Sequence, residues 1–163
     1  MDVQKTKPNR IIDYHTLEKL QSIQNKTLAS VVCYLWLNEI NTKEVVSVID
    51  AVEFIFTDGN KIVLAANEEQ ERLVSVEYRF EEQKLLLNKT FGEKIKLFKV
   101  PANSTDMWKD VVLTKLLNVR MNKDKDTGHY LCDECIFEFE NQEKRLIQVH
   151  PIDGLILDYY EII

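Results

Sequence analysis

A tight-turn signal flanked by two alternating segments constrains the fold of this chain more than any other feature of its sequence. Residues 45–56 place apolar side chains at alternate positions and end with Phe54 and Phe56. Residues 57–60 then read Thr-Asp-Gly-Asn, and the Asp-Gly pair tolerates the positive φ angles of a tight hairpin. Residues 61–65 return with a second alternating pattern. We therefore expect an antiparallel hairpin and a fold built mainly from β-strands.

Other segments carry the alternation, or the β-branched and aromatic composition, that is typical of strands. The predicted strands are residues 28–37, 72–80, 94–100, 117–122, 129–140, 144–149 and 154–162. Apolar residues at helical spacing predict two helices. One begins after Asp13, which we expect to cap it, and the other covers residues 106–116. Asp50 interrupts the pattern of its segment, which indicates a bulge or bend.

The order of one helix followed by four strands occurs twice along the chain, which indicates an internal duplication. Phe54 and Phe56 correspond to Phe137 and Phe139, and other apolar positions match at a similar spacing. Each repeat would have an apolar sheet face that it cannot bury alone, so the two aromatic hairpins should face one interior. We expect an α+β, mostly β fold whose antiparallel sheets form a sandwich or a partly open barrel.

The length of 163 residues fits one domain. We expect residues 1–12 to form a flexible N-terminal tail and residues 13–163 to form a single domain. Within it, the pseudo-repeats 13–92 and 93–163 would share one core. A chain of this size buries roughly two-thirds of its unfolded surface, so it needs no metal or disulfide to fold.

The chain is acidic, with 27 acidic and 21 basic residues and a net charge of −6. Nucleic acids and anionic membranes require clustered cations, so both are disfavoured as partners. Residues 1–10 lack the apolar segment of a secretion signal, and no apolar stretch is long enough to span a membrane, so we expect neither a signal nor a membrane span. Its three cysteines form an odd set, unlike a disulfide framework. These features predict a cytoplasmic protein.

The strongest motif for metal chemistry is a Cys-x-x-Cys pair with two histidines in the sequence around it. His129, Cys132, Cys135 and His150 could supply four zinc ligands. In a strand, however, residues three apart point to opposite faces. We expect Cys135 to face inward with Phe137 and Cys132 to face outward, so these residues remain weak candidates. We predict neither a metal nor a cofactor.

Acidic clusters and adjacent tyrosines offer a surface for a basic partner. The candidate partner-binding residues are Glu68, Glu69, Glu71, Glu81, Glu82, Tyr159 and Tyr160. The alternative without a binding role is that the acidic residues form an ordinary solvated surface and the tyrosines are structural residues.

The chain has four isolated glycines, which cannot form a phosphate-binding loop or a nucleophile elbow. We therefore favour a non-enzymatic protein-interaction module, for example an acidic inhibitor of a basic toxin domain. One alternative is a small-molecule-binding β domain with a pocket between the two halves. A second alternative is a metal- or thiol-dependent enzyme. The partner and the oligomeric state stay open.

Overall fold

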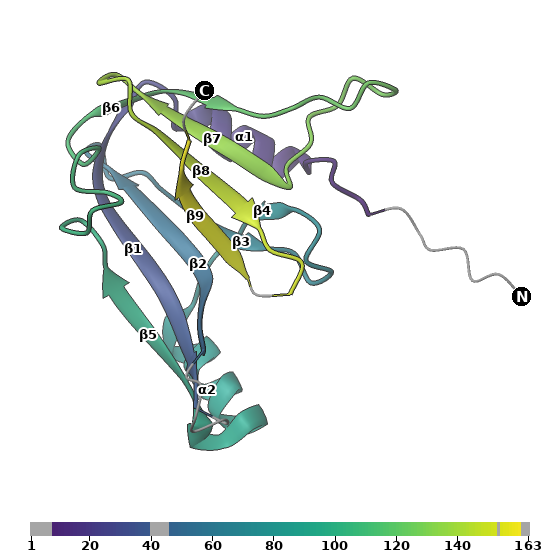
Figure 1. Cartoon of the computed structure of the whole chain (residues 1–163), viewed down its shortest axis with the longest axis vertical. Coiled ribbons are helices and arrows are strands. Elements are labelled where there is room, and N and C mark those ends of the chain that lie inside the picture. Colours follow the sequence, from purple (N-terminus) through teal and green to yellow (C-terminus); the bar gives the residue numbers. More distant parts are fainter. Residues whose placement is uncertain (1–7, 40–45, 153, 161–163) are drawn as a thin grey trace, which may run out of the picture.

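Six antiparallel strands form a closed ring around the main core (Figure 1). The computed structural model describes residues 8–39, 46–152 and 154–160. Around the ring the strand order is β1, β2, β9, β8, β7, β6 and back to β1. The ring strands are β1 (Lys26–Asn38), β2 (Val46–Phe56), β6 (Lys115–Arg120), β7 (Glu134–Phe139), β8 (Lys144–Val149) and β9 (Leu155–Tyr159).

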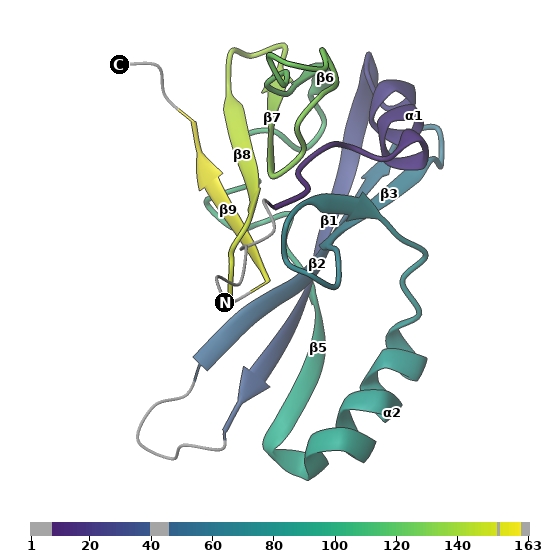
Figure 2. The ribbon, with the colours of Figure 1, turned by 90° about the vertical axis from the view of Figure 1, so that its right-hand side faces the viewer.

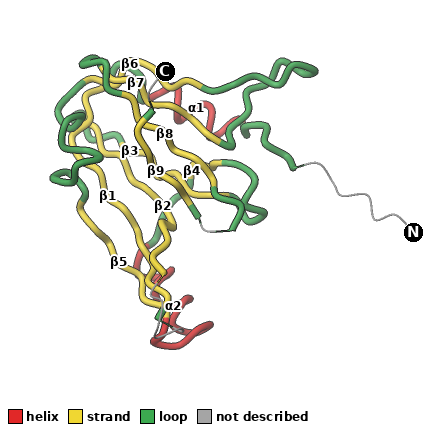
Figure 3. Tube along the Cα trace, in the orientation of Figure 1, coloured by secondary structure: helices red, strands yellow, loops and turns green. Residues whose placement is uncertain are grey.

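Three further strands extend the sheet beyond the ring. Strands β3 (Lys61–Ala66) and β4 (Leu73–Ser75) continue from β2, and β5 (Ile95–Pro101) pairs with β1. Figure 3 shows how strongly strands dominate the fold. The prediction of a mostly β, antiparallel fold is confirmed, with a closed barrel in place of the sandwich or partly open barrel that we expected.

The predicted hairpin is present as β2 and β3. Phe54 lies opposite Ile62 in the ladder between these strands. In the ladder between β1 and β2, Tyr34 lies opposite Ala51 and the next residue of β1 lies opposite Ile49. Asp50 is therefore the extra residue of a β-bulge, which confirms the interruption predicted at this position.

The two aromatic hairpins face one interior, as the sequence predicts. The ring of Phe54 lies 4.9 Å from that of Phe137 and 5.3 Å from that of Trp108, measured between ring centroids. Phe56 and Phe139 are buried in the same cluster. Burial of such large apolar side chains contributes on the order of 2 kcal/mol each, so this cluster is the main stabilising feature of the ring.

The first predicted helix is confirmed and the second is wrong. Helix α1 (Tyr14–Ser22) begins after Asp13, whose Oδ1 accepts a hydrogen bond of 2.7 Å from the Thr16 backbone N–H. Residues 106–114 instead form successive turns, and residues 115 and 116 already belong to β6. The backbone N–H of Leu113 donates to the Leu28 carbonyl, so pairing with β1 overrides the helical pattern.

A second helix, α2 (Phe80–Phe91), lies where we predicted the end of a strand and then no element. The predicted strand over residues 72–80 is right only for β4. The short helix η1 (Gly92–Lys94) follows α2 and leads into β5. The predicted strand over residues 129–140 is right only for β7.

The internal duplication is not confirmed by this arrangement, because turns at 106–114 take the place of the predicted second helix in the repeat. Residues 1–7 of the predicted tail lie outside the described residues. The end of that tail contacts the domain. The backbone N–H of Ile12 donates to the Tyr130 carbonyl over 3.0 Å, and the Cys132 N–H donates to the Arg10 carbonyl over 2.7 Å.

Closure of the ring between β2 and β9 provides a test of the fold. Among the described residues this seam has one ladder pair, Ile49 with Leu155. Gly154 has a φ of +67°, and a Cβ there would overlap the Ile49 carbonyl oxygen and lie 2.9 Å from Val48 Cγ1. We predict that Gly154→Ala lowers the free energy of unfolding by about 2–4 kcal/mol. Urea denaturation measures this.

The matched control is Gly59→Ala in the hairpin turn. Gly59 also has a positive φ, +87°, but nothing lies within 4 Å of the added Cβ. Its cost should be about 1 kcal/mol, from backbone strain alone. Equal losses in the two variants would show that the seam does not need the close approach at Gly154.

Candidate functional site

The outer face of β1, β2 and β3 carries a second apolar cluster, separate from the main core. Along β1, Val31 belongs to the main core, whereas Val32 and Tyr34 belong to this second cluster. Since successive residues of a strand face opposite ways, both faces of β1 are buried here. Residues 76–80, which connect β4 to α2 and include its first residue, cover the second cluster with Val76, Tyr78 and Phe80.

A tyrosine pair fixes these covering residues on the sheet. The rings of Tyr34 and Tyr78 lie 4.2 Å apart, and the Tyr78 hydroxyl donates a 2.6 Å hydrogen bond to Asp50 Oδ2. Burial, followed by the hydrogen bond and charge of Asp50, raises the pKa of Tyr78 above its ordinary value. The Tyr78 hydroxyl is therefore a stable donor that orients the carboxylate of the bulge residue.

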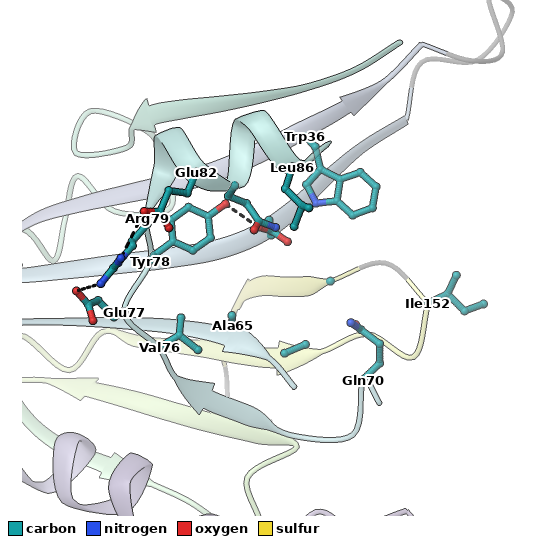
Figure 4. Close-up of a pocket in the computed structure, with 14 residues that line it drawn as sticks. Trp36, Ala65, Gln70, Val76, Glu77, Tyr78, Arg79, Glu82, Leu86 and Ile152 are labelled. Carbon is teal, nitrogen blue, oxygen red and sulfur yellow. Dashed lines mark hydrogen bonds and ion pairs between the residues drawn. The ribbon is translucent and has the colours of Figure 1, made fainter. Parts of the chain in front are cut away.

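Beside this pair lies a pocket of about 550 Å³, drawn in Figure 4. It lies between the sheet, the covering residues and the first turns of α2. Side chains from separate segments meet in it. Among them are Trp36 of β1, Asp50 of β2, Gln70 of the β3–β4 turn, Glu82 and Leu86 of α2, and Ile152 of the β8–β9 connection. Its volume is within the range of about 300–1,000 Å³ that is usual for ligand sites.

Two buried polar atoms of the pocket residues have no hydrogen-bond partner within the described part of the chain. They are the indole Nε1 of Trp36 and the amide Oε1 of Gln70. Leaving a buried donor or acceptor unpaired costs about 1–3 kcal/mol. A group that supplies an acceptor for Trp36 and a donor for Gln70 would recover that cost.

Carboxylates dominate the charge of the pocket. Asp50, Glu77 and Glu82 line it together with one cation, Arg79, so their formal charges sum to −2. The Arg79 guanidinium lies 3.6 Å from Glu77 and 3.4 Å from Glu82, in pairs that are largely exposed. Asp50 Oδ1 accepts no hydrogen bond from the described residues, which leaves it available to a donor.

The predicted partner-binding residues occupy several parts of the surface. Glu82 lines the pocket, and Glu81 lies beside it in the first turn of α2. The β3–β4 turn holds Glu68, Glu69 and Glu71. Glu69 accepts a hydrogen bond from Asn67, and Glu71 accepts one from the backbone of Asn9.

The two predicted tyrosines lie at the C-terminal end of β9, at the opposite end of the molecule from α2 (Figure 1). The Tyr159 ring lies 4.6 Å from the Arg145 guanidinium, and the Tyr160 ring lies 5.5 Å from that of Arg120. They do not form one surface with the acidic clusters. Sequence reasoning missed Trp36, Gln70 and Tyr78, and the only available signal was a carboxylate at the bulge.

The weak metal candidates are not grouped as a site. His129 is exposed in a loop, whereas Cys132 and Cys135 are fully buried. The prediction that Cys132 faces outward is wrong, because β7 begins only at Glu134 and its alternation does not reach back that far. His150 follows β8 and accepts a hydrogen bond from the Ile152 backbone N–H.

Within the described ranges, no group of three or more His, Cys, Asp or Glu side chains is arranged to hold a metal ion. Neither α1 nor α2 combines the length and apolar character that crossing a membrane demands, and these are the α-helices of the described residues.

The buried thiols predict a loss of stability at high pH. Burial raises the pKa of Cys33 to about 11 and that of Cys132 to about 12, from an ordinary value of 9.0. Because the pKa of each thiol is higher in the folded state than in the unfolded state, its contribution to stability is complete below about pH 9. That contribution is lost as the pH rises toward 12. We predict that the free energy of unfolding falls less between about pH 8 and 10.5 in Cys132→Ala than in the parent. Parallel curves from urea titrations would contradict this.

The Tyr78–Asp50 hydrogen bond gives a further test. Replacing Tyr78 with Phe removes the donor and leaves the carboxylate in a partly buried position. The free energy of unfolding should fall by about 1–2 kcal/mol in urea denaturation. Tyr14→Phe is the control, because Tyr14 is 79% exposed and its change should be within about 0.5 kcal/mol. Equal losses of stability in the Tyr78→Phe and Tyr14→Phe variants would show that the Tyr78 hydroxyl does not anchor the covering residues.

Comparisons with known proteins give no model for this pocket. No family model, no curated protein and no solved structure matches the chain. The chemistry of the pocket therefore has to be inferred from its own side chains.

Proposed function

We propose that this protein is a non-enzymatic interaction module whose pocket beside α2 takes a lysine or arginine side chain of a basic partner protein. One observation carries the proposal. Trp36 and Gln70, each with one buried polar atom that has no hydrogen-bond partner in the described part of the chain, line the same cavity as an excess of carboxylates.

A cationic side chain complements most of the pocket. Its N–H groups would donate to Gln70 Oε1 and to Asp50, whose second oxygen is already held by Tyr78. The formal charge of −2 on the lining residues favours a cation over a neutral group. The indole face of Trp36 adds a cation–π contact, worth about 0.5–2 kcal/mol where it forms.

The unpaired indole N–H favours a polypeptide over a simple amine. Lysine and arginine side chains have donors and no acceptor, so they cannot pair with Trp36 Nε1. A backbone carbonyl of the partner supplies the acceptor. The mouth of the pocket also presents apolar surface, with Leu86 57% exposed and Ile152 81% exposed. Apolar side chains around a polar centre are typical of protein interfaces.

The main alternative is a free small amine as the ligand, since the cavity volume of about 550 Å³ suits a small molecule. The pocket differs from the one expected between two halves of the chain. Most of its lining comes from residues 36–86, with Ile152 and Gly154 contributed by the second half.

Two finer expectations accompany this proposal. A cytoplasmic location is supported by the three cysteines, which are buried and free of disulfides and so suit a reducing compartment. The internal duplication is supported by the shared packing of Phe54 and Phe137, one from each predicted repeat.

Titration with blocked amino acids tests the proposal directly. The chain has two tryptophans, so its NMR spectrum should hold two indole N–H signals, and Trp36→Phe assigns them. We expect Nα-acetyl-lysine methylamide, or its arginine counterpart, to shift the Trp36 signal with a millimolar dissociation constant. The Trp108 signal should not move, because that ring is buried in the main core.

Variants and analogues separate the outcomes. Asp50→Asn should weaken binding about fivefold to tenfold, and Glu82→Gln about twofold to threefold, because its carboxylate is exposed. Glu81→Gln is the matched control and should bind as the parent does. Equal binding of butylamine would support the small-amine alternative. Equal binding of the Nε-acetylated lysine derivative, or no shift with any probe, would end the proposal.

A further inference from the structure

A second hollow, of about 490 Å³, is lined by residues of α2, of β5 and of the short connection between them. Figure 2 shows α2 alongside β5. This hollow shares no lining residue with the acidic pocket. The residues that line it are Phe80, Lys84, Asn88, Glu93, Ile95, Lys96, Leu97, Phe98 and Lys99. We call this hollow the β5 groove.

The residues along the β5 groove define its direction. Residues 95–99 are consecutive in β5, and successive side chains of a strand point to opposite faces. Five consecutive residues line one hollow only if the hollow follows the edge of the strand. Phe80, Lys84 and Asn88 are each four residues apart, so they form one stripe of α2. The groove therefore runs between a strand edge and a helix stripe.

The backbone along this edge is unpaired. Strand β5 is the last strand of the sheet and pairs with β1 alone among the described strands. The Ala102 N–H donates to the Val31 carbonyl, and the Glu39 N–H donates to the Lys94 carbonyl. In an antiparallel ladder the direction of these groups alternates, so the even-numbered residues of β5 face β1. Ile95, Leu97 and Lys99 then direct their N–H and C=O groups into the groove.

The β5 groove is basic in an acidic protein. Lys84, Lys96 and Lys99 line it against one acid, Glu93, so their formal charges sum to +2, whereas the whole chain carries −6. The Lys96 ammonium lies 3.8 Å from the Glu39 carboxylate, and both side chains are exposed. A carboxylate of a ligand can therefore take the place of Glu39 in this weak ion pair. Phe98 adds apolar surface, being 43% exposed.

From these features we propose that the β5 groove binds an extended acidic segment of a partner protein, which adds to the sheet as a strand beside β5. The backbone of the segment pairs with the outward groups of Leu97 and Lys99. Its acidic side chains meet the lysines, and an apolar side chain covers Phe98. Strand addition to an exposed edge is a general mode of peptide recognition, with affinity from the backbone and specificity from side chains. This site is independent of the acidic pocket.

A designed peptide pair tests the charge requirement. The probe is a fluorescent six-residue peptide that alternates glutamate and valine, and its counterpart carries lysine in place of glutamate. We expect the acidic peptide to bind at least tenfold more tightly in fluorescence anisotropy. Lys84→Glu should weaken the acidic peptide at least fivefold, and it changes no backbone group of β5. Equal binding of both peptides, or no binding, would overturn the proposal.

A proline substitution tests the strand addition. Lys99→Pro removes one outward N–H and leaves the ladder with β1 intact, since residue 99 does not donate to β1. We expect it to weaken the acidic peptide about tenfold, whereas Lys99→Ala, which keeps the N–H, should weaken it about threefold. Hydrogen exchange at Leu97 and Lys99 should slow when the peptide binds. Equal effects of the two substitutions, or unchanged exchange, would reject pairing with β5.

Two controls separate the remaining outcomes. Glu82→Gln alters the acidic pocket and should not change peptide binding, so the two sites can fail separately. Sedimentation of the free protein measures its oligomeric state, and so tests whether a second copy of the chain occupies the β5 groove. A dimer that Lys99→Pro dissociates would assign the edge to self-association and overturn the proposal, and a monomer is the expected result.

Discussion

Strand β1 is buried on both faces along its centre, and this constraint organises the rest of the molecule. Val31 and Cys33 face the interior of the ring, whereas Val32 and Tyr34 face a second cluster outside it. A strand of this kind needs cover on two sides, because neither face can be left to water. The ring strands and α1 supply one cover, and residues 76–80 supply the other.

The bulge at Asp50 turns this structural requirement into a site. An extra residue in β2 places a carboxylate next to the outer cluster, where the Tyr78 hydroxyl holds it at 2.6 Å. The same hydrogen bond fixes the segment that leads into α2. The pocket, its charge and the start of the helix therefore depend on one irregularity in the longest ladder of the sheet, which agrees with the tendency of bulges to lie near functional sites.

Much of the local structure could be predicted from the sequence, because short-range chemistry determines it. The Asp-Gly hairpin, the Asp50 bulge and the Asp13 cap each depend on a few neighbouring residues. The helix over residues 106–116 failed because Trp108 and its neighbours serve the core through turns, while pairing with Leu28 ends them. Helical spacing alone does not separate these two ways of burying the same side chains.

The candidate site could not be predicted, because its parts come from distant segments. Trp36, Asp50 and Gln70 meet only when β1, β2 and β3 pair and the β3–β4 turn folds over them, and Ile152 joins them from the far side of the β2–β9 seam. The sequence also gives no sign that Trp36 Nε1 and Gln70 Oε1 lack hydrogen-bond partners, because a tryptophan or glutamine with all its hydrogen bonds formed is written in the same way. Local density of acidic residues in the sequence is a poor guide to this site, since of the predicted glutamates Glu82 alone is part of the pocket lining.

Helix α2 contributes residues to both proposed sites. The sites carry opposite charge, so the net charge of the whole chain does not indicate the charge of either one. None of its residues is buried, although it contains several leucines. Glu82 and Leu86 face the acidic pocket, and Phe80 and Lys84 face the β5 groove. Acidic residues in the first turn favour the positive end of the helix dipole, so the acidic side of the pocket also stabilises the helix. A helix placed between two hollows of opposite charge presents separate chemistry on each side, and a partner with both a basic side chain and an acidic strand could engage both.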